Sequence, residues 1–247
     1  MLNFFAKKSP VDGKYIISGS DYNHIKNVLR MSSGDEILVS FEGKSSLCVL
    51  DGFSDENVCA VITEEDCNNT ELPVKIILFQ GLPKADKMEL IIQKCTELGI
   101  SEIIPTEMSR CVVKLEEKKK KSKTERWQAI AESAAKQSKR NVIPHVSTPL
   151  SFGEALNMIS ELDLFLVPYE NEMGMKATSE ALSLIKPGMK IGILIGPEGG
   201  FDDKEIEKAR TIGCRSVSLG KRILRTETAA ITAAAMCMLY CETNFEE

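Results

Sequence analysis

The sequence has no long hydrophobic run, and its first residues have no secretory signal. A helix that crosses a bilayer needs about 18 or more consecutive apolar residues, and the chain of 247 residues contains no such run. Residues 1–10 also lack the apolar core of a signal peptide. With 43% hydrophobic and 27% charged residues, the composition is that of an ordinary globular protein. We therefore expect a cytoplasmic protein.

Metal-binding and disulfide patterns are missing as well. The eight cysteines are scattered, none forms a C-x-x-C pair, and only two histidines could assist them. Zinc sites and disulfide frameworks both need more regular spacing. We expect no metal site, and cysteines that are reduced and mostly buried as small hydrophobic residues.

Nucleotide phosphate signatures are also absent. Neither G-x-x-x-x-G-K-[ST] nor G-x-G-x-x-G can be read between Gly196 and Lys204. Residues 196–200 instead read GPEGG and directly follow the apolar run 191–195. Three glycines in this loop let a ligand lie against the main chain, although Gly-Pro and Gly-Gly also make ordinary turns. The pattern predicts a buried strand, a tight loop and a helix that Asp202 can cap.

A second loop repeats this plan. Residues 217–219 predict a short strand, residues 220–225 a basic turn, and Thr226 the start of an alanine-rich helix that reaches Tyr240. Residues 169–170 also follow a predicted strand. Ligand loops in parallel sheets lie at the carboxyl ends of strands. We therefore expect the three loops to converge on one ligand pocket.

Charge is unevenly distributed. The net charge of −5 argues mildly against nucleic-acid binding, which usually leaves a basic footprint. However, residues 1–72 hold 6 Lys and Arg against 12 Asp and Glu, whereas residues 110–140 hold 11 against 4. The lysine run within residues 114–123 is compatible with a solvated helix face. Better candidates for phosphate contacts are the basic residues outside that run, Arg110, Lys136, Lys139 and Arg140.

The pattern of predicted elements changes near residue 72. Residues 1–71 predict short strands, tight turns and one amphipathic helix over 21–31, which is typical of a small, partly closed β-barrel. The polar, acidic stretch 64–73 ends in proline and predicts a linker. Residues 72–247 alternate apolar strands with helices. The second domain is therefore predicted to be α/β with a parallel sheet.

Several motifs along the chain together resemble one known family. They are HIKNVLR at 24–30, KMELIIQKCTELGI at 87–100, SRCVVK at 109–114, KQSKRNVIP at 136–144, GPEGG at 196–200 and LGKRILRTETA at 219–229. In order and spacing they resemble the bacterial 16S ribosomal RNA uridine N3-methyltransferases (the RsmE family). These belong to the SPOUT class of S-adenosylmethionine-dependent RNA methyltransferases, and the resemblance covers nearly the whole chain.

The resemblance implies a fold and a reaction. The expected fold is a PUA-like RNA-binding barrel over 1–71, followed over 72–247 by a SPOUT domain with a C-terminal trefoil knot and cofactor loops at about 190–240. The expected cofactor is S-adenosyl-L-methionine. The expected partners are 16S ribosomal RNA within the small ribosomal subunit and a second copy of the chain in a homodimer. The expected reaction is methylation of uridine N3 in the decoding region.

The resemblance and the chemistry of the reaction also imply site residues. Arg225 is expected to stabilise negative charge on the uracil oxygens, with pairing to Glu227 as the alternative. Glu198 is expected to position the substrate or bind the cofactor amine, with Glu170 and Glu227 as weaker candidates. The residues expected to bind the cofactor are Leu194, Ile195, Gly196, Gly199, Gly200, Leu219, Gly220, Ile223, Leu224, Thr226 and Thr228. Those expected to bind RNA are His24, Arg30, Arg110, Lys114, Lys139 and Arg140.

One position departs from the family pattern. The family commonly has an arginine just before its paired N-terminal aromatic residues, whereas this chain has Asn3 before Phe4 and Phe5. If that arginine touches RNA in relatives, Lys7 or Lys8 would have to supply the charge here.

Three other functions remain compatible with the sequence. The first is a SPOUT enzyme that methylates the ribose 2′-hydroxyl, and the second is a non-catalytic RNA-binding protein that keeps the fold. The third is an enzyme that uses the GPEGG loop to bind nucleotide phosphate at a helix N-terminus.

Overall fold

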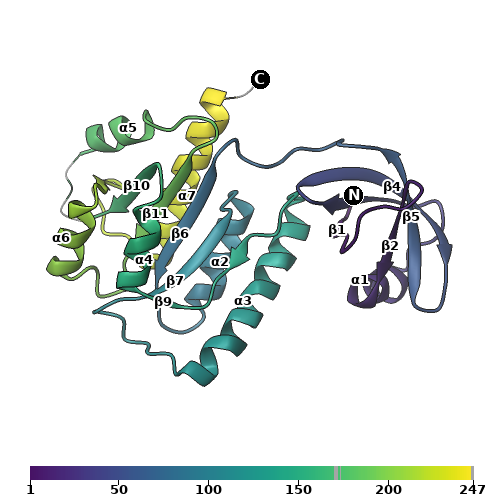
Figure 1. Cartoon of the computed structure of the whole chain (residues 1–247), viewed down its shortest axis with the longest axis horizontal. Helices are drawn as coiled ribbons and strands as arrows, with labels where there is room; N and C mark the ends of the chain where they lie inside the picture. The colour runs from purple at the N-terminus through teal and green to yellow at the C-terminus, as the bar shows by residue number, and fades with distance from the viewer. Residues whose placement is uncertain (170–171, 173, 246–247) are drawn as a thin grey trace. The chain divides into compact units, whose positions relative to one another are not determined.

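The chain forms two compact units, and neither is continuous in sequence. The computed structural model describes residues 1–169, 172 and 174–245 (Figure 1). The first unit consists of Met1–Glu71 and Ala135–Ile143, and the second of Leu72–Ala134 and Pro144–Glu247. None of the described helices is long and apolar enough to cross a membrane.

A curled sheet of five strands forms most of the first unit. Across the sheet the order is β1 (Asn3–Phe5), β3 (Glu36–Phe41), β4 (Lys44–Phe53), β5 (Asn57–Glu64) and β2 (Lys14–Ser18). Neighbouring strands are antiparallel except β1 and β3, which are parallel. Two register shifts between β4 and β5 allow the strands to bend. The partly closed sheet predicted for this region is confirmed.

One short helical segment packs against this sheet. It begins as α1 (Gly19–Asn23) and continues as a π-helical turn, η1 (His24–Val28). Tyr22 and Ile25 face inward because their spacing places both on one side of the segment. They join a core made by the sheet residues Phe4, Tyr15, Ile17, Ile37, Val39, Cys48, Leu50, Val58 and Ala60. The helix predicted over 21–31 therefore lies where expected, but it is shorter and partly π-helical.

The second unit contains a parallel sheet. Its order is β12 (Arg215–Val217), β10 (Leu164–Pro168), β11 (Lys190–Ile195), β6 (Lys75–Gly81), β7 (Glu102–Glu107) and β8 (His145–Val146), and β9 (Leu150–Ser151) also pairs with β7. Every pairing is parallel. The central strands β6 and β11 are apolar and almost wholly buried, as expected when helices cover both faces.

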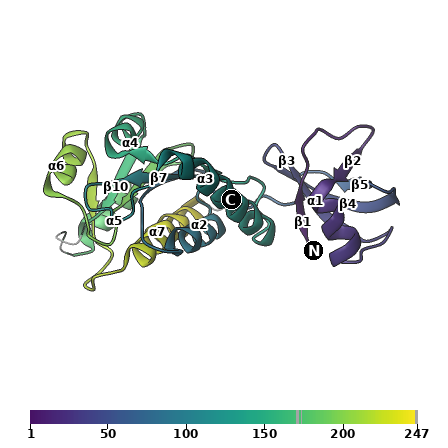
Figure 2. The same ribbon diagram turned by 90° about the horizontal axis from the view of Figure 1, so that it is seen from below.

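Helices cover both faces of this sheet. They are α2 (Lys87–Glu97), α3 (Glu117–Gln137), α4 (Phe152–Ile159), α5 (Lys176–Leu182), α6 (Asp203–Thr211) and α7 (Thr226–Phe245). Figure 2 shows α2 and α7 on one face and α4 and α6 on the other. The predicted α/β architecture is confirmed, and the carboxyl ends of β6, β10, β11 and β12 lie along one edge of the sheet.

Some element boundaries differ from the prediction. The strand predicted over 217–219 ends at Val217, because Ser218 exchanges hydrogen bonds of 2.9 Å with Thr178 of α5. The alanine-rich helix α7 extends past Tyr240 to Phe245. The basic helix α3 begins at Glu117 and so includes the lysine run, in which Lys120 forms ion pairs with acidic side chains.

Candidate active site

The GPEGG loop follows β11 and packs closely on its neighbour β6. A Cβ placed on Gly81, the last residue of β6, would lie 2.7 Å from the backbone nitrogen of Pro197. Glycine is therefore required there for the loop to approach. Gly200 has a φ of +68°, which glycine adopts at no steric cost. Asp202 caps the start of α6, as the sequence predicted, and forms a capping box with Glu205.

The second loop joins the first through a buried hydroxyl. Thr226, the first residue of α7, donates to the carbonyl oxygen of Gly196 at 2.7 Å. It accepts a hydrogen bond of 2.9 Å from the Nε2 group of Gln80 in β6. Three segments that are far apart in sequence are thus linked by two hydrogen bonds. The structure places the GPEGG loop and the start of α7 side by side.

An ion-pair cluster lies at the same edge of the sheet. Lys87 Nζ is 2.9 Å from Glu198 Oε1 and 3.4 Å from Glu227 Oε2. Only the first contact is also a hydrogen bond. Glu198 Oε1 also accepts from the backbone N–H of Lys84 at 3.0 Å. The side chains of Lys87, Glu198 and Glu227 form what we call the Lys87 cluster, which connects the segments that follow β6, β11 and β12.

Contacts within the Lys87 cluster favour the charged forms of Glu198 and Lys87. Partial burial raises the pKa of the Glu198 carboxyl, but the hydrogen bonds from Lys87 and from the Lys84 amide outweigh burial, so its pKa lies below the usual value. The hydrogen bond to Glu198 raises the pKa of Lys87. The carboxylate of Glu198 is therefore bound to protein groups and supports the loop in this structure.

Arg225 has a different environment from that of Glu227, the acidic residue two positions further along the chain. It lies immediately before α7, is exposed, and makes no side-chain hydrogen bond or ion pair with the residues that the structure describes. The alternative in which it pairs with Glu227 is not what the structure shows, because Glu227 faces Lys87. The guanidinium is available for a ligand.

The remaining predicted cofactor residues fall into two groups. Leu194 and Ile195 are buried in β11, and Gly196, Gly199 and Gly200 form the first loop. Leu219, Gly220, Ile223, Leu224 and Thr228 line the second loop and the start of α7, where Ile223 is 88% exposed.

The second loop leaves room for a ligand. Gly220 has a φ of +104°, and a Cβ there would have only the far end of the Arg222 side chain, 3.9 Å away, within contact range among the described residues. A narrow apolar pocket opens beside this loop and is lined in part by Pro168, Val217, Leu219 and Met236. The pocket has room for about one water molecule, so a larger ligand can approach the open main chain at Gly220.

Arg110, which was predicted to bind RNA, contacts the predicted cofactor loop directly. Its Nη1 donates to the carbonyl oxygen of Gly199 at 3.2 Å, and its Nη2 is 3.9 Å from Asp202. A Cβ on Gly199 would lie 3.0 Å from the Arg110 Cβ. The structure thus joins a predicted RNA-binding residue to the predicted cofactor loop, while Lys114 is exposed a few residues further along.

The other predicted RNA-binding residues belong to the first unit, and three of them are exposed. They are His24, Arg30 and Lys139. The ring of His24 packs edge-on against Phe4, with 6.3 Å between the centroids. Arg30 and Lys139 have φ values of +54° and +57°, a conformation that usually favours glycine.

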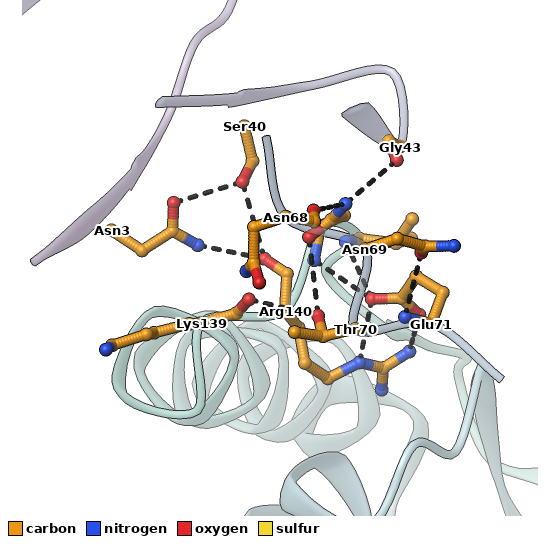
Figure 3. A network of polar contacts seen from close by, with 11 residues as sticks. Asn3, Ser40, Gly43, Asn68, Asn69, Thr70, Glu71, Lys139 and Arg140 are labelled. Atoms are coloured by element: carbon orange, nitrogen blue, oxygen red, sulfur yellow. Dashed lines mark hydrogen bonds and ion pairs between the residues drawn. The ribbon is translucent and has the colours of Figure 1, made fainter. Parts of the chain in front are cut away.

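Arg140 is a correction to the predicted RNA-binding set. Its residue is only 2% exposed, and its Nε donates to Glu71 Oε1 at 3.1 Å while its Nη2 binds the other oxygen of the same carboxylate (Figure 3). An arginine held in this bidentate way has no surface to offer to phosphate. Its role is structural, because it joins the linker at residue 71 to the segment after α3.

Asn3 also has a structural role. It is 3% exposed, and its side chain donates to the carbonyl oxygen of Arg140 at 2.9 Å and accepts from Ser40 Oγ at 3.0 Å (Figure 3). Position 3 is therefore an interior position in this chain. Its asparagine helps to hold Ala135–Ile143 against the sheet of the first unit.

Sequence reasoning missed two residues of the candidate site. Lys87 and Gln80 were not predicted, although both lie near the end of β6, where the strand-end rule directs attention. One residue predicted as a weaker candidate, Glu170, lies outside the described residues.

Comparisons with known proteins agree over most of the chain. Residues 70–238 match a family model described as an RNA methyltransferase domain, and residues 17–62 match an RNA methyltransferase PUA domain. The ribosomal RNA small subunit methyltransferase E of Bacillus subtilis is 42% identical over 89% of this chain and 87% of its own. That of Mesomycoplasma hyopneumoniae is 33% identical over 96% and 99%. The crystal structure of the Neisseria gonorrhoeae protein of this name, bound to S-adenosyl methionine, is 31% identical, covers 97% of both chains and has a TM-score of 0.83.

Proposed function

Since the chain belongs to the ribosomal RNA small subunit methyltransferase E family, we propose that it transfers a methyl group from S-adenosylmethionine to N3 of a uridine in 16S ribosomal RNA. The proposed uridine lies in the decoding region of the small subunit, and the proposed location of the reaction is the cytoplasm. The observation that carries the proposal is the position of Arg225, which is unpaired among the described residues and lies beside two linked glycine loops.

The loops are suited to hold the cofactor. The main chain at Gly196, Gly199 and Gly200 turns tightly after β11, and Gly220 leaves the second loop open. Leu219 and the small apolar pocket beside it offer apolar contacts to the ring of the cofactor, while Ile223, which is exposed, and Leu224 can close over the bound ring. When bound, S-adenosylmethionine supplies a methyl group attached to a positively charged sulfur.

Arg225 acts on the uracil ring. N3 becomes a nucleophile when its proton passes to water, and negative charge then spreads onto O2 and O4 of the ring. A guanidinium stays charged at every relevant pH, and its N–H groups can donate hydrogen bonds to a carbonyl oxygen of the ring and to an adjacent acceptor. Placed beside the ring, Arg225 stabilises the charge that develops in the transition state. Glu198 holds the loop through Lys87 and the Lys84 amide.

The first unit supplies the RNA contacts. His24, Arg30 and Lys139 are exposed there, and Arg110 and Lys114 add positive charge beside the catalytic loops of the second unit. Contacts of this kind with phosphate fix where the RNA lies and leave the choice of base to the pocket. We assign most of the RNA recognition to the first unit, with added contacts from Arg110 and Lys114, and methyl transfer to the second unit.

The knot and the dimer are part of the same proposal. The chain leaves β12 at the edge of the sheet, yet α7 packs against β11 and β6 in its middle, which supports a path through the preceding loops. Leu90 on α2, Ile223 in the second loop and Leu239 on α7 are exposed apolar side chains, which supports association with a second copy. Sedimentation or light scattering that gave only monomer would contradict the dimer.

The reaction is tested by the nucleoside that forms. The purified protein is incubated with labelled S-adenosylmethionine and small ribosomal subunits from a strain that lacks its own enzyme, and the RNA is digested for mass spectrometry. We expect 3-methyluridine with the wild type and a loss of it with Arg225→Ala while cofactor binding survives. A ribose 2′-O-methylated nucleoside would instead establish the alternative SPOUT reaction, and no methylated nucleoside would contradict both.

A further inference from the structure

We propose that Lys87 is a positioning residue that keeps Arg225 unpaired. By occupying the carboxylate of Glu227, Lys87 prevents Glu227 from capturing the guanidinium of Arg225. The inference rests on the proposed function, in which Arg225 acts on the uracil ring, and it assigns Lys87 a part in that reaction.

The first step is the position of Lys87. It is the first residue of α2, and its ammonium lies between two carboxylates that follow two other strands, 2.9 Å from Glu198 and 3.4 Å from Glu227. The side chains are 29%, 24% and 14% exposed respectively, so solvent screens the contacts only in part. The ammonium of Lys87 thus pairs with one carboxylate from the GPEGG loop and with another at the start of α7.

The second step is the balance of charge. The Lys87 cluster holds two carboxylates and one ammonium, so it carries one excess negative charge at neutral pH. Glu198 has a second donor in the Lys84 amide, whereas Glu227 has no second donor among the described residues. The Oε2 atom of Glu227 is buried and accepts no hydrogen bond from the described residues. Lys87 Nζ lies 3.4 Å from this atom, which is an ion-pair distance, but it is not aligned for a hydrogen bond. Lys87 is therefore the one counter-ion of Glu227 among the described residues, and without Lys87 the carboxylate would be left to another donor.

The third step is the identity of the competing donor. Arg225 lies two residues before Glu227 and makes no ion pair with the described residues. Residues two apart on a helix face different sides, but Arg225 precedes the first residue of α7, so the helix does not fix the direction of its side chain. Once Lys87 is removed, a partly buried carboxylate without a counter-ion lies two residues along the chain from an exposed guanidinium. Pairing between them is the favoured outcome, because leaving a buried charge alone is costly.

The test uses the removal and the restoration of activity. Lys87→Met should lower kcat for 3-methyluridine formation by about 100-fold, the cost of displacing a reacting group by roughly an ångström. The change in the Kd for S-adenosylmethionine, measured by calorimetry, should be much smaller. The double variant Lys87→Met with Glu227→Gln should recover most of the lost kcat, since the neutral amide no longer captures Arg225. A role limited to holding the Glu198 loop would not be restored in this way.

Three control variants complete the design. Lys87→Arg keeps the cation and should retain activity. Glu227→Gln alone keeps Lys87 and removes the competing carboxylate, so its kcat should be no lower than that of the double variant. Lys94→Met removes a lysine of the same helix whose ion pair is with Glu97 in that helix, and it should leave kcat unchanged.

A failure of this inference can be distinguished from a failure of the proposed function. If the wild type forms no 3-methyluridine, the proposed function fails. If it does, the inference is overturned by a Lys87→Met variant with normal kcat, by a double variant as slow as Lys87→Met, or by an inactive Glu227→Gln variant. It is also overturned if Arg225→Ala keeps full activity, because Arg225 would then have no role to protect.

Discussion

Thr226 and Gly196 are joined by a hydrogen bond of 2.7 Å, although they lie 30 residues apart. The donor begins α7, and the acceptor is the first residue of the GPEGG loop. Because the same hydroxyl accepts from the buried Gln80, the bond has little solvent with which to compete. It holds the two loops of the candidate site at a defined separation.

Replacement of Thr226 should therefore weaken both stability and cofactor binding. Thr226→Val keeps the shape but leaves the Gly196 carbonyl and a Gln80 N–H without this partner, at a cost of about 1–3 kcal/mol in the free energy of unfolding. Urea denaturation and calorimetry with S-adenosylmethionine would measure the two effects. Thr226→Ser retains the hydroxyl and should behave like the wild type. A Val variant of unchanged stability would show that the bond is unimportant.

Gly81 should tolerate no side chain. A Cβ at this position would lie 2.7 Å and 2.8 Å from Pro197 atoms, so Gly81→Ala must push the GPEGG loop away from β6. We expect cofactor binding to fall by at least about tenfold, as for a loop displaced by a few tenths of an ångström or more. Gly153→Ala is the matched control, because a methyl group at that position would have no described atom within 4 Å. Equal cofactor affinity in the two variants would refute the expectation.

Arg140 should matter for stability rather than for RNA affinity. Arg140→Met leaves the Glu71 carboxylate without its main partner, and breaking such a pair costs about 3 kcal/mol, the lower end of the range because Glu71 is partly exposed. Denaturation would report the loss. If the variant were as stable as the wild type but bound ribosomal subunits less tightly, Arg140 would belong to the RNA-binding surface after all.

Lys139 allows stability and binding to be separated. Its φ of +57° places a lysine where helices commonly end in glycine, so Lys139→Gly should stabilise the first unit by up to about 1 kcal/mol. The same change should weaken binding to small subunits if the exposed ammonium contacts phosphate. Lys139→Asn also removes the charge and tolerates this conformation, so it should lose binding to the same extent. Unchanged binding in both variants would remove Lys139 from the RNA-binding set.

The contribution of the Glu198–Lys87 pair to the free energy of unfolding should not change with pH near neutrality. The pKa of Glu198 lies below its ordinary value of 4.5, so its contribution is present above that value and is lost as the pH falls through the pKa of the folded state. The pKa of Lys87 lies above its ordinary value of 10.5, so its contribution is present below that value and is lost as the pH rises through the folded pKa. The difference in Tm between wild type and Glu198→Gln should stay constant from about pH 6 to pH 9 and shrink in acid. A difference that grows in acid would contradict this assignment.

Much of the fold could be predicted because local patterns and tertiary structure agree. The apolar runs predicted at 74–80 and 191–195 became the central strands β6 (Lys75–Gly81) and β11 (Lys190–Ile195), and Asp202 caps α6 as predicted. Strands in the first unit also lie where alternation placed them. β1 and α5 were not predicted, since three or seven residues carry too little periodic signal.

The candidate site was less predictable because its geometry depends on partners distant in sequence. Composition indicated that Arg110 and Arg140 were equivalent basic residues. In the structure, Arg110 donates to the Gly199 carbonyl of the GPEGG loop, whereas Arg140 is buried against Glu71. The choice between Arg225 and Lys87 as the partner of Glu227 could not be made from spacing, because Lys87 is 140 residues away along the chain.

The sequence by itself determined most of the segments that form strands and helices and which loops contain glycine, because these properties depend on residues within a few positions of one another. Only the tertiary structure decided which charges are paired, which are buried and which remain free for a ligand. The physical reason is that the energy of a charge depends on its solvent exposure and on partners within a few ångströms, and folding brings those partners from every part of the chain.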